Sequence, residues 1–155
     1  DADADIRIAF EPGHASWSYL GTMARDAPPR AATVNFGWLA ADSPDDDLAR
    51  VVLHEFGHAL GLTHEYLHPD EAVTWDRQAV SRDLSAVPGT WDDQAIDVRV
   101  VAPHDPSDPM TESVDPRSIM ICPVPGTWTH GQFSVGFNAS LTDIDKDYVR
   151  VAYPW

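Results

Sequence analysis

The stretch from His54 to His64 carries three histidines and one glutamate at a spacing that suits a catalytic zinc site. On a helix, His54 and His58 stand on one face about one turn (~6 Å) apart, so both imidazoles can reach one metal ion. Glu55 lies beside the first ligand, where it can contact a metal-bound water without ligating the metal. Gly61 can adopt a left-handed conformation that ends the helix, and the chain then returns His64 as a third ligand. Three protein ligands leave a fourth position open, which is typical of a catalytic site.

The pattern HExxHxxGxxH over residues 54–64 resembles the metzincin signature. Ser118-Ile119-Met120 resembles the Met-turn that follows this signature in the family. The closest likeness is to astacin-type proteases and their bacterial relatives, because Trp17-Ser18-Tyr19 resembles their substrate-binding edge strand and Glu65 follows the third histidine as in astacins. The resemblance runs from about Ile6 to Tyr153.

This resemblance implies a zinc-dependent endopeptidase. The zinc ligands would be His54, His58 and His64. Glu55 would act as the general base that takes a proton from the metal-bound water and passes it to the leaving amine. The substrate would be a protein or peptide that binds extended along Trp17, Ser18 and Tyr19, adding a strand to the sheet.

Three further residues complete the predicted site. Met120 is expected beneath the zinc as a hydrophobic floor. Glu65 is expected to support the third ligand or to contact a chain terminus, by resemblance to astacins. Cys122 departs from the family, since astacin-like proteases carry a tyrosine two residues after the Met-turn methionine. Cys122 could ligate the zinc as a thiolate, but its short side chain favours a neutral thiol that leaves the fourth position open.

Two rival interpretations remain. A thermolysin-like protease would take a distant glutamate as third ligand, and Gly61 and His64 argue against it. A non-catalytic zinc-binding pseudoprotease, acting as an interaction module, would keep the same ligands without hydrolysis. The five fixed positions of the motif coincide by chance about once in 10⁷–10⁸ starts, so scattered surface histidines explain them poorly.

Composition limits the remaining functions. The 155 residues predict one domain with a formal net charge of −15, which argues against nucleic acid and against anionic membrane surfaces as partners. No apolar run approaches the ~18 residues of a membrane span. A single cysteine allows no internal disulfide, so secretion is inferred from the protease resemblance alone.

The elements that must position the site begin with three predicted strands. Alternating apolar residues predict strands at residues 6–10, 16–20 and 33–39, the first with Ile6, Ile8 and Phe10 on a buried face. A helix is predicted from about Pro44 to Leu60, with a capping side chain from Asp42-Ser43 in front of the proline.

The second half is predicted to be irregular. Short helices are expected at residues 75–87 and 91–98, and Thr142 is expected to cap a last helix that ends near Tyr153. Asp143, Asp145 and Asp147 resemble half of a calcium loop. The glycine and the terminal glutamate of such a loop are missing, so we assign all three to the helix surface and keep Ca²⁺ only as an alternative second cofactor.

These elements predict an α+β fold for residues 1–155, and the resemblance implies that it is metzincin-like. A small twisted mixed sheet and the zinc helix would form an upper part to about residue 64. A lower part with the Met-turn would follow from about residue 65. Metzincins usually begin with a further strand and a long helix, so we expect that an N-terminal segment or propeptide is supplied separately.

Overall fold

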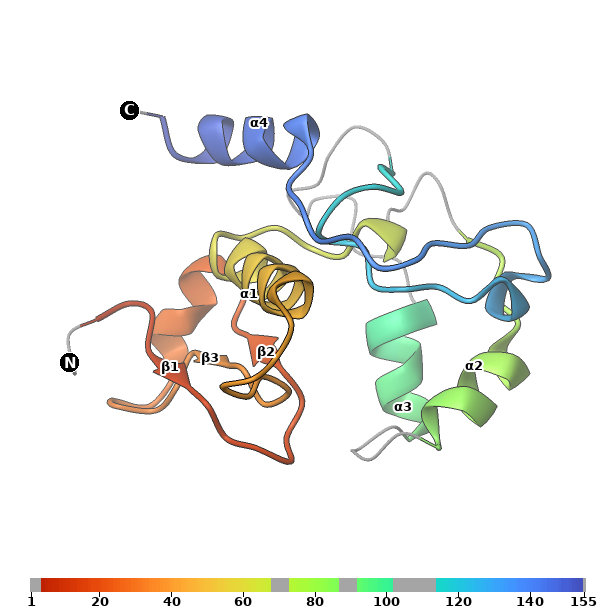
Figure 1. Ribbon diagram of the computed structural model, residues 1–155, viewed down its shortest axis with the longest axis horizontal. Helices are drawn as coiled ribbons and strands as arrows, with labels where there is room; N and C mark the ends of the chain where they lie inside the picture. Colours follow the sequence, from red (N-terminus) through yellow and green to blue (C-terminus); the bar gives the residue numbers. More distant parts are fainter. Residues whose placement is uncertain (1–3, 68–72, 87–91, 102–113, 155) are drawn as a thin grey trace. The chain divides into compact units, whose positions relative to one another are not determined.

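The computed structural model describes residues 4–67, 73–86, 92–101 and 114–154 (Figure 1). The chain divides into two compact units, which are treated separately below. The first unit comprises residues 1–63, 118–120 and 138–155, and the second comprises residues 64–117 and 121–137. In chain order the elements are β1 (Ile8–Ala9), β2 (Trp17–Ser18), η1 (Gly21–Asp26), β3 (Val34–Asn35), α1 (Asp45–Ala59), η2 (Glu65–Leu67), α2 (Arg77–Leu84), α3 (Asp93–Ile96), η3 (Asp97–Val101), η4 (Gly126–Thr129) and α4 (Asp143–Ala152).

A three-stranded mixed sheet forms the base of the first unit. Its strand order is β1-β3-β2, with β1 parallel and β2 antiparallel to the central β3. Each strand is two residues long, which is shorter than predicted, but all three lie inside their predicted ranges. The small mixed sheet expected for an α+β fold is confirmed.

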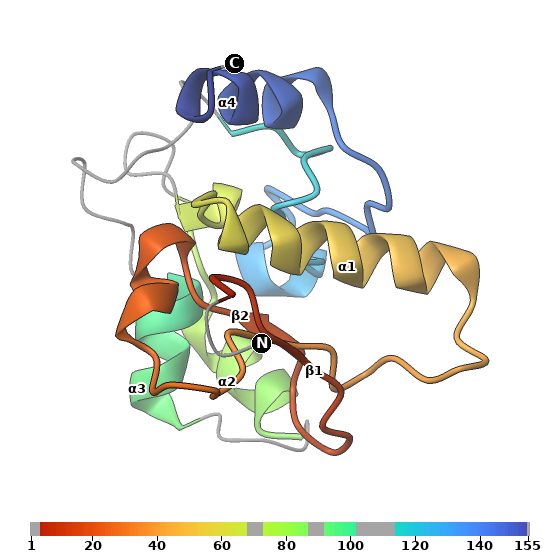
Figure 2. The ribbon, with the colours of Figure 1, turned by 90° about the vertical axis from the view of Figure 1, so that its left-hand side faces the viewer.

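The apolar face predicted for the first strand is exposed. Ile6, Ile8 and Phe10 keep 36%, 48% and 67% of their surface accessible, so their assignment to a buried face was wrong. The buried positions belong instead to Val34 and Phe36 at the central strand, because α1 packs against β2 and β3 (Figure 2). Strand β1 lies at one edge of the sheet, where alternation alone does not decide which face is covered.

Helix α1 spans Asp45–Ala59, close to its predicted range. The predicted cap was wrong, because Pro44 itself occupies the N-cap position and no side chain caps the helix. The hydroxyl of Ser43 instead accepts a hydrogen bond from the Ala40 N–H at 2.9 Å, which closes the preceding turn. Three aspartates in the first turn still suit the positive end of the helix dipole.

Helix α4 spans Asp143–Ala152 and begins as predicted at Thr142. The Thr142 hydroxyl accepts from the Asp145 N–H, and the Asp145 carboxylate accepts from the Thr142 N–H, forming a capping box. Asp145 is only 1% exposed, so its assignment to the helix surface was wrong. Its carboxylate points into the first unit instead, where it meets the segment 118–120.

The second unit holds α2, α3 and two apolar clusters. Helices α2 and α3 lie inside their predicted ranges, and Asp76 caps α2 by accepting from the Ala79 N–H. One cluster centres on Tyr66, Ile121 and Val124, and the other on Val80, Ile96 and Val100. Trp75 and Trp128 pack against both clusters and so join them. Across the described parts of both units, no helix is long and apolar enough to cross a membrane.

Candidate functional site

Helix α1 presents His54 and His58 side by side. Their ring centroids are 4.8 Å apart and the rings are nearly perpendicular. His54 Nδ1 lies 2.8 Å from the Ile119 carbonyl oxygen, and His58 Nδ1 lies 2.8 Å from the Leu62 carbonyl oxygen. A carbonyl can only accept, so each Nδ1 carries the proton and each Nε2 keeps its lone pair. Both histidines therefore have the tautomer that a metal ligand needs.

The turn after α1 supplies one of those two carbonyls. Gly61 has φ of +97°, the left-handed conformation predicted for it. The Leu62 N–H donates to the Gly57 carbonyl at 3.0 Å and the Gly61 N–H donates to the His58 carbonyl at 2.8 Å, which is a Schellman ending. This turn brings the Leu62 carbonyl back to the His58 ring. The glycine of the motif thus ends the helix and orients a predicted ligand.

The segment Ser118–Met120 supplies the other carbonyl and packs under α1. Met120 is fully buried, in a cluster with Leu62 and Ile119. A Cβ added at Gly57 would lie 2.2 Å from the Met120 sulfur. Only glycine at that position of α1 lets the methionine approach so closely. Met120 therefore lies directly beneath the turn of the helix that carries His54 and His58.

Burial shifts the pKa values of two side chains on α1, Glu55 and His54. Glu55 is 5% exposed, and this burial raises the pKa of its carboxyl to about 8. Burial also lowers the pKa of His54, opposed by its bond to the Ile119 carbonyl and assisted by the nearby Arg50. In the metal-free protein at neutral pH, Glu55 is therefore protonated and His54 is neutral. A cation bound close to Glu55 would favour its ionised form.

The second unit begins with His64, the remaining predicted ligand. Its ring stacks on Tyr66 with centroids 5.1 Å apart, and its Nε2 lies 3.8 Å from the Cys122 sulfur. Burial, together with Cys122, raises the pKa of the Tyr66 hydroxyl well above its usual value. Glu65 is 4% exposed and accepts a hydrogen bond from the Asp115 N–H at 3.4 Å.

The predicted substrate strand is β2, an edge of the sheet in the first unit. The Tyr19 N–H donates to the Thr33 carbonyl at 2.9 Å, so the backbone of Tyr19 faces β3. Antiparallel ladders alternate, and the N–H and C=O of Ser18 therefore point away from β3. Trp17 is 37% exposed and its ring contacts Tyr19 edge-on. This edge has the backbone arrangement that an added strand would use.

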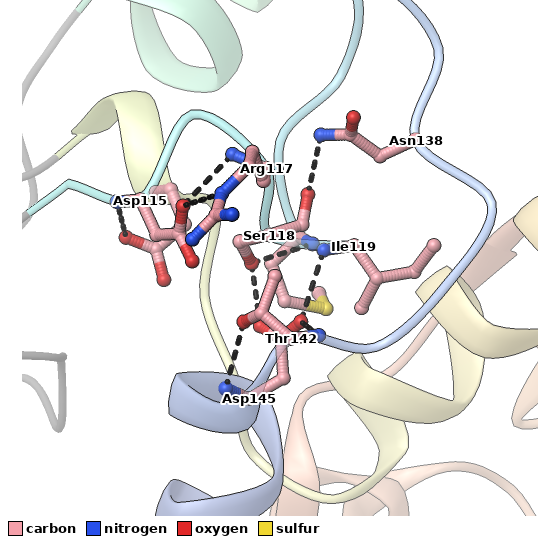
Figure 3. A network of polar contacts seen from close by, with 9 residues as sticks. Asp115, Arg117, Ser118, Ile119, Asn138, Thr142 and Asp145 are labelled. Atoms are coloured by element: carbon pink, nitrogen blue, oxygen red, sulfur yellow. Dashed lines mark hydrogen bonds and ion pairs between the residues drawn. The ribbon is translucent and has the colours of Figure 1, made fainter.

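Figure 3 shows hydrogen bonds of Ser118 and Asp145 that the sequence did not predict. The Asp145 carboxylate accepts from the Ser118 hydroxyl at 2.6 Å and from the Ile119 N–H at 3.1 Å. The side chain of Asn138 donates to the Ser118 carbonyl at 2.9 Å. The capping-box spacing of Thr142 and Asp145 was visible in the sequence. It predicts the helix start, but not a contact with a segment about 25 residues earlier.

Solved structures of one named protein are similar to this chain. A structure described as "Structure of myroilysin" has a TM-score of 0.90 and 36% sequence identity, covering 97% of this chain and 73% of that chain. A second, "Crystal structure of myroilysin", has a TM-score of 0.68 and 34% identity, covering 97% of this chain and 66% of that chain. No protein-family model and no curated protein matches. The likeness therefore extends over nearly the whole of this chain.

Proposed function

The chain belongs to the family of myroilysin, a metalloprotease, and on that premise we propose that it is a zinc-dependent endopeptidase of the metzincin type. The observation that carries the proposal is the pair His54 and His58 on α1, whose rings are each oriented by a backbone carbonyl at Nδ1, as zinc-binding histidines usually are. Within the metzincins, we favour an astacin-like enzyme, because Trp17-Ser18-Tyr19 and Glu65 resemble the corresponding segments of astacins.

The donor set suits zinc. Each of His54, His64 and Cys122 offers one atom that can ligate a metal ion. His58 is not in that group and is assigned by its place in the motif. Zinc prefers such nitrogen and sulfur donors. We assign His54, His58 and His64 as the three ligands, because their spacing fits the family motif. Cys122 then serves as a neutral thiol beside His64, in the place of the family's tyrosine.

Bound zinc would supply the Lewis acidity that polarises a peptide carbonyl and acidifies water. Glu55 is the general base in this proposal. Its neighbour His54 is one of the ligands, and its burial excludes bulk water from the carboxyl group. Glu55 would take a proton from the attacking water and return it to the leaving amine nitrogen. A raised pKa in the apolar surroundings makes the carboxylate a stronger base once it is ionised.

The substrate in this proposal is an extended peptide. The open N–H and C=O of Ser18 on β2 would pair with its backbone, and Trp17 and Tyr19 would flank it. The net charge of −15 disfavours nucleic acid and anionic membrane surfaces as partners. Secretion is part of the proposal, by analogy with the family.

Metal analysis combined with casein digestion tests the proposal. We expect one zinc per chain, hydrolysis that a chelator abolishes, and recovery when zinc is added back. One bound zinc without hydrolysis would favour the non-catalytic pseudoprotease instead. A chain that binds no zinc would refute the proposed metal site.

A further inference from the structure

A continuous run of hydrogen bonds links a buried carboxylate to a proposed zinc ligand. The Ser118 hydroxyl donates to Asp145 Oδ1 at 2.6 Å and accepts from the Met120 N–H at 3.0 Å. That N–H belongs to the same peptide group as the Ile119 carbonyl, which accepts from His54 Nδ1 at 2.8 Å. All five residues lie in the first unit.

We propose that Asp145 is a positioning residue for the zinc ligand His54 and acts through Ser118 and the Ile119–Met120 peptide group. This inference rests on the proposed function, since it assigns His54 to the metal. Asp145 shares neither an element nor a sequence motif with the histidines. We refer to this path of hydrogen bonds, from Asp145 through Ser118 and the peptide group to His54, as the relay.

Burial strengthens the effect of the Asp145 carboxylate charge on its hydrogen-bond partners. Asp145 is 1% exposed and Ser118 is fully buried. The carboxylate is satisfied by three donors, the Ser118 hydroxyl, the Ile119 N–H and the Thr142 N–H. A buried ionised carboxylate with several donors is stable, and its charge is little screened by water. The negative charge of Asp145 therefore polarises the three groups that donate hydrogen bonds to it.

The direction of every bond favours a stronger ligand at His54. Donation to Asp145 makes the Ser118 oxygen a better acceptor for the Met120 N–H. That bond in turn makes the Ile119 carbonyl a better acceptor for His54 Nδ1–H, because hydrogen bonds in a chain polarise one another. A stronger bond at Nδ1 raises the electron density at Nε2 and holds the ring in one orientation.

His58 provides an internal comparison. Its carbonyl partner is Leu62, whose own N–H donates to Gly57 in the turn that ends α1. This contact does not pass through Ser118 or Asp145. Changes in the relay should therefore alter the His54 ring and leave the His58 ring as it is.

Zinc affinity of two relay variants tests the inference. Asp145→Asn keeps the shape but removes the charge, and Ser118→Ala removes the hydroxyl that joins Asp145 to the peptide group. We expect each to weaken zinc binding by about 10–100-fold, the range found for groups that orient a ligand. The double variant should be little worse than either single one, because both break the same path.

Thr142→Ala is the matched control. It removes the hydroxyl that caps α4 and so destabilises the same helix, but it keeps the Thr142 N–H that donates to Asp145. At an equal loss of thermal stability in the metal-free protein, Thr142→Ala should keep zinc affinity close to that of the unaltered chain. An equal loss of affinity in Thr142→Ala would reduce Asp145 to a purely structural role. Unchanged affinity in Ser118→Ala would also overturn the inference, even if Asp145→Asn does not fold.

The ¹⁵N chemical shifts of the His54 and His58 imidazole nitrogens in the metal-free protein give a second test. We expect ¹⁵N NMR of Ser118→Ala to show the Nδ1-protonated tautomer of His54 less fully populated, with the signals of His58 unchanged. This measurement separates the two proposals. An unaltered chain that binds no zinc refutes the proposed function, whereas a zinc-binding chain whose His54 signals ignore Ser118→Ala refutes only the relay.

Discussion

The two units hold the proposed zinc ligands in different ways. In the first unit, His54 and His58 are each held by a backbone carbonyl, and Met120 packs under the helix between them. In the second unit, His64 stacks on Tyr66 and directs its Nε2 towards the Cys122 thiol. The first unit therefore orients its two proposed ligands through backbone carbonyls, whereas the second orients its proposed ligand through an aromatic ring and places a thiol beside it.

Because of this difference, substitutions in the two units should have different effects on activity and zinc binding. Changes in the first unit should affect the chemistry and the orientation of two ligands. Changes in the second should affect the completion of the metal site. The following predictions separate these two effects, from the largest expected to the smallest.

Glu55→Gln should cause the largest loss of turnover. The amide keeps the size of the buried side chain but cannot accept a proton, so kcat should fall by about 10²–10⁴-fold. Zinc content and the melting temperature should stay close to those of the unaltered chain. Turnover at the original rate in this variant would remove Glu55 from the mechanism.

His64→Ala removes the zinc ligand that we assign to the second unit. With two ligands left on α1, zinc affinity should fall by more than about 100-fold, because losing a ligand costs more than losing a group that orients one. The first unit should keep its fold, which circular dichroism of the metal-free protein would show. Full zinc occupancy in His64→Ala would contradict the three-histidine assignment.

The metal-free protein should lose stability as the pH rises from about 4.5 to about 8. The carboxyl of Glu55 has its pKa raised from 4.5 to about 8, so over this window the folded state holds a proton that the unfolded state has released. The stabilisation is complete below pH 4.5, falls by on the order of 1.4 kcal/mol per pH unit and levels off above about pH 8.

The difference in unfolding free energy between the unaltered chain and Glu55→Gln isolates this effect. Other groups titrate alike in both proteins, so the difference should change with pH only through Glu55. A difference that is constant from pH 4.5 to pH 8 would show that burial does not raise the pKa of Glu55 as described.

Cys122→Ser should have the smallest effect. If the thiol is neutral, the hydroxyl replaces it with little change in kcat or zinc affinity. Cys122→Tyr, by contrast, should raise kcat, because a phenol can supply the oxyanion donor of the family, a contact worth ~10²-fold or more in turnover. Strong activation by Cys122→Ser would instead identify the thiolate as a zinc ligand that keeps the enzyme latent.

Much of the first unit could be predicted because the signals are local. The four-residue spacing of His54 and His58 is a property of any helix, and Gly61 adopts the positive φ that its place at the helix end requires. Thr142 caps α4 through contacts within one turn. The errors arose where a local pattern had two readings. The hydroxyl of Ser43 can cap a helix or close a turn, and here it closes the turn.

The sequence by itself determined the helix that carries His54, Glu55 and His58 and the turn that follows it, because these depend on residues at most a few positions apart. The tertiary structure alone decided the role of Asp145 and the exposure of Ile8. Asp145 is buried only because residues 118–120 lie against the start of α4. Ile8 is exposed because α1 packs against β2 and β3 while β1 lies at the sheet edge. Contacts between distant segments depend on which surfaces pack together, and periodicity along one segment carries no record of its partner.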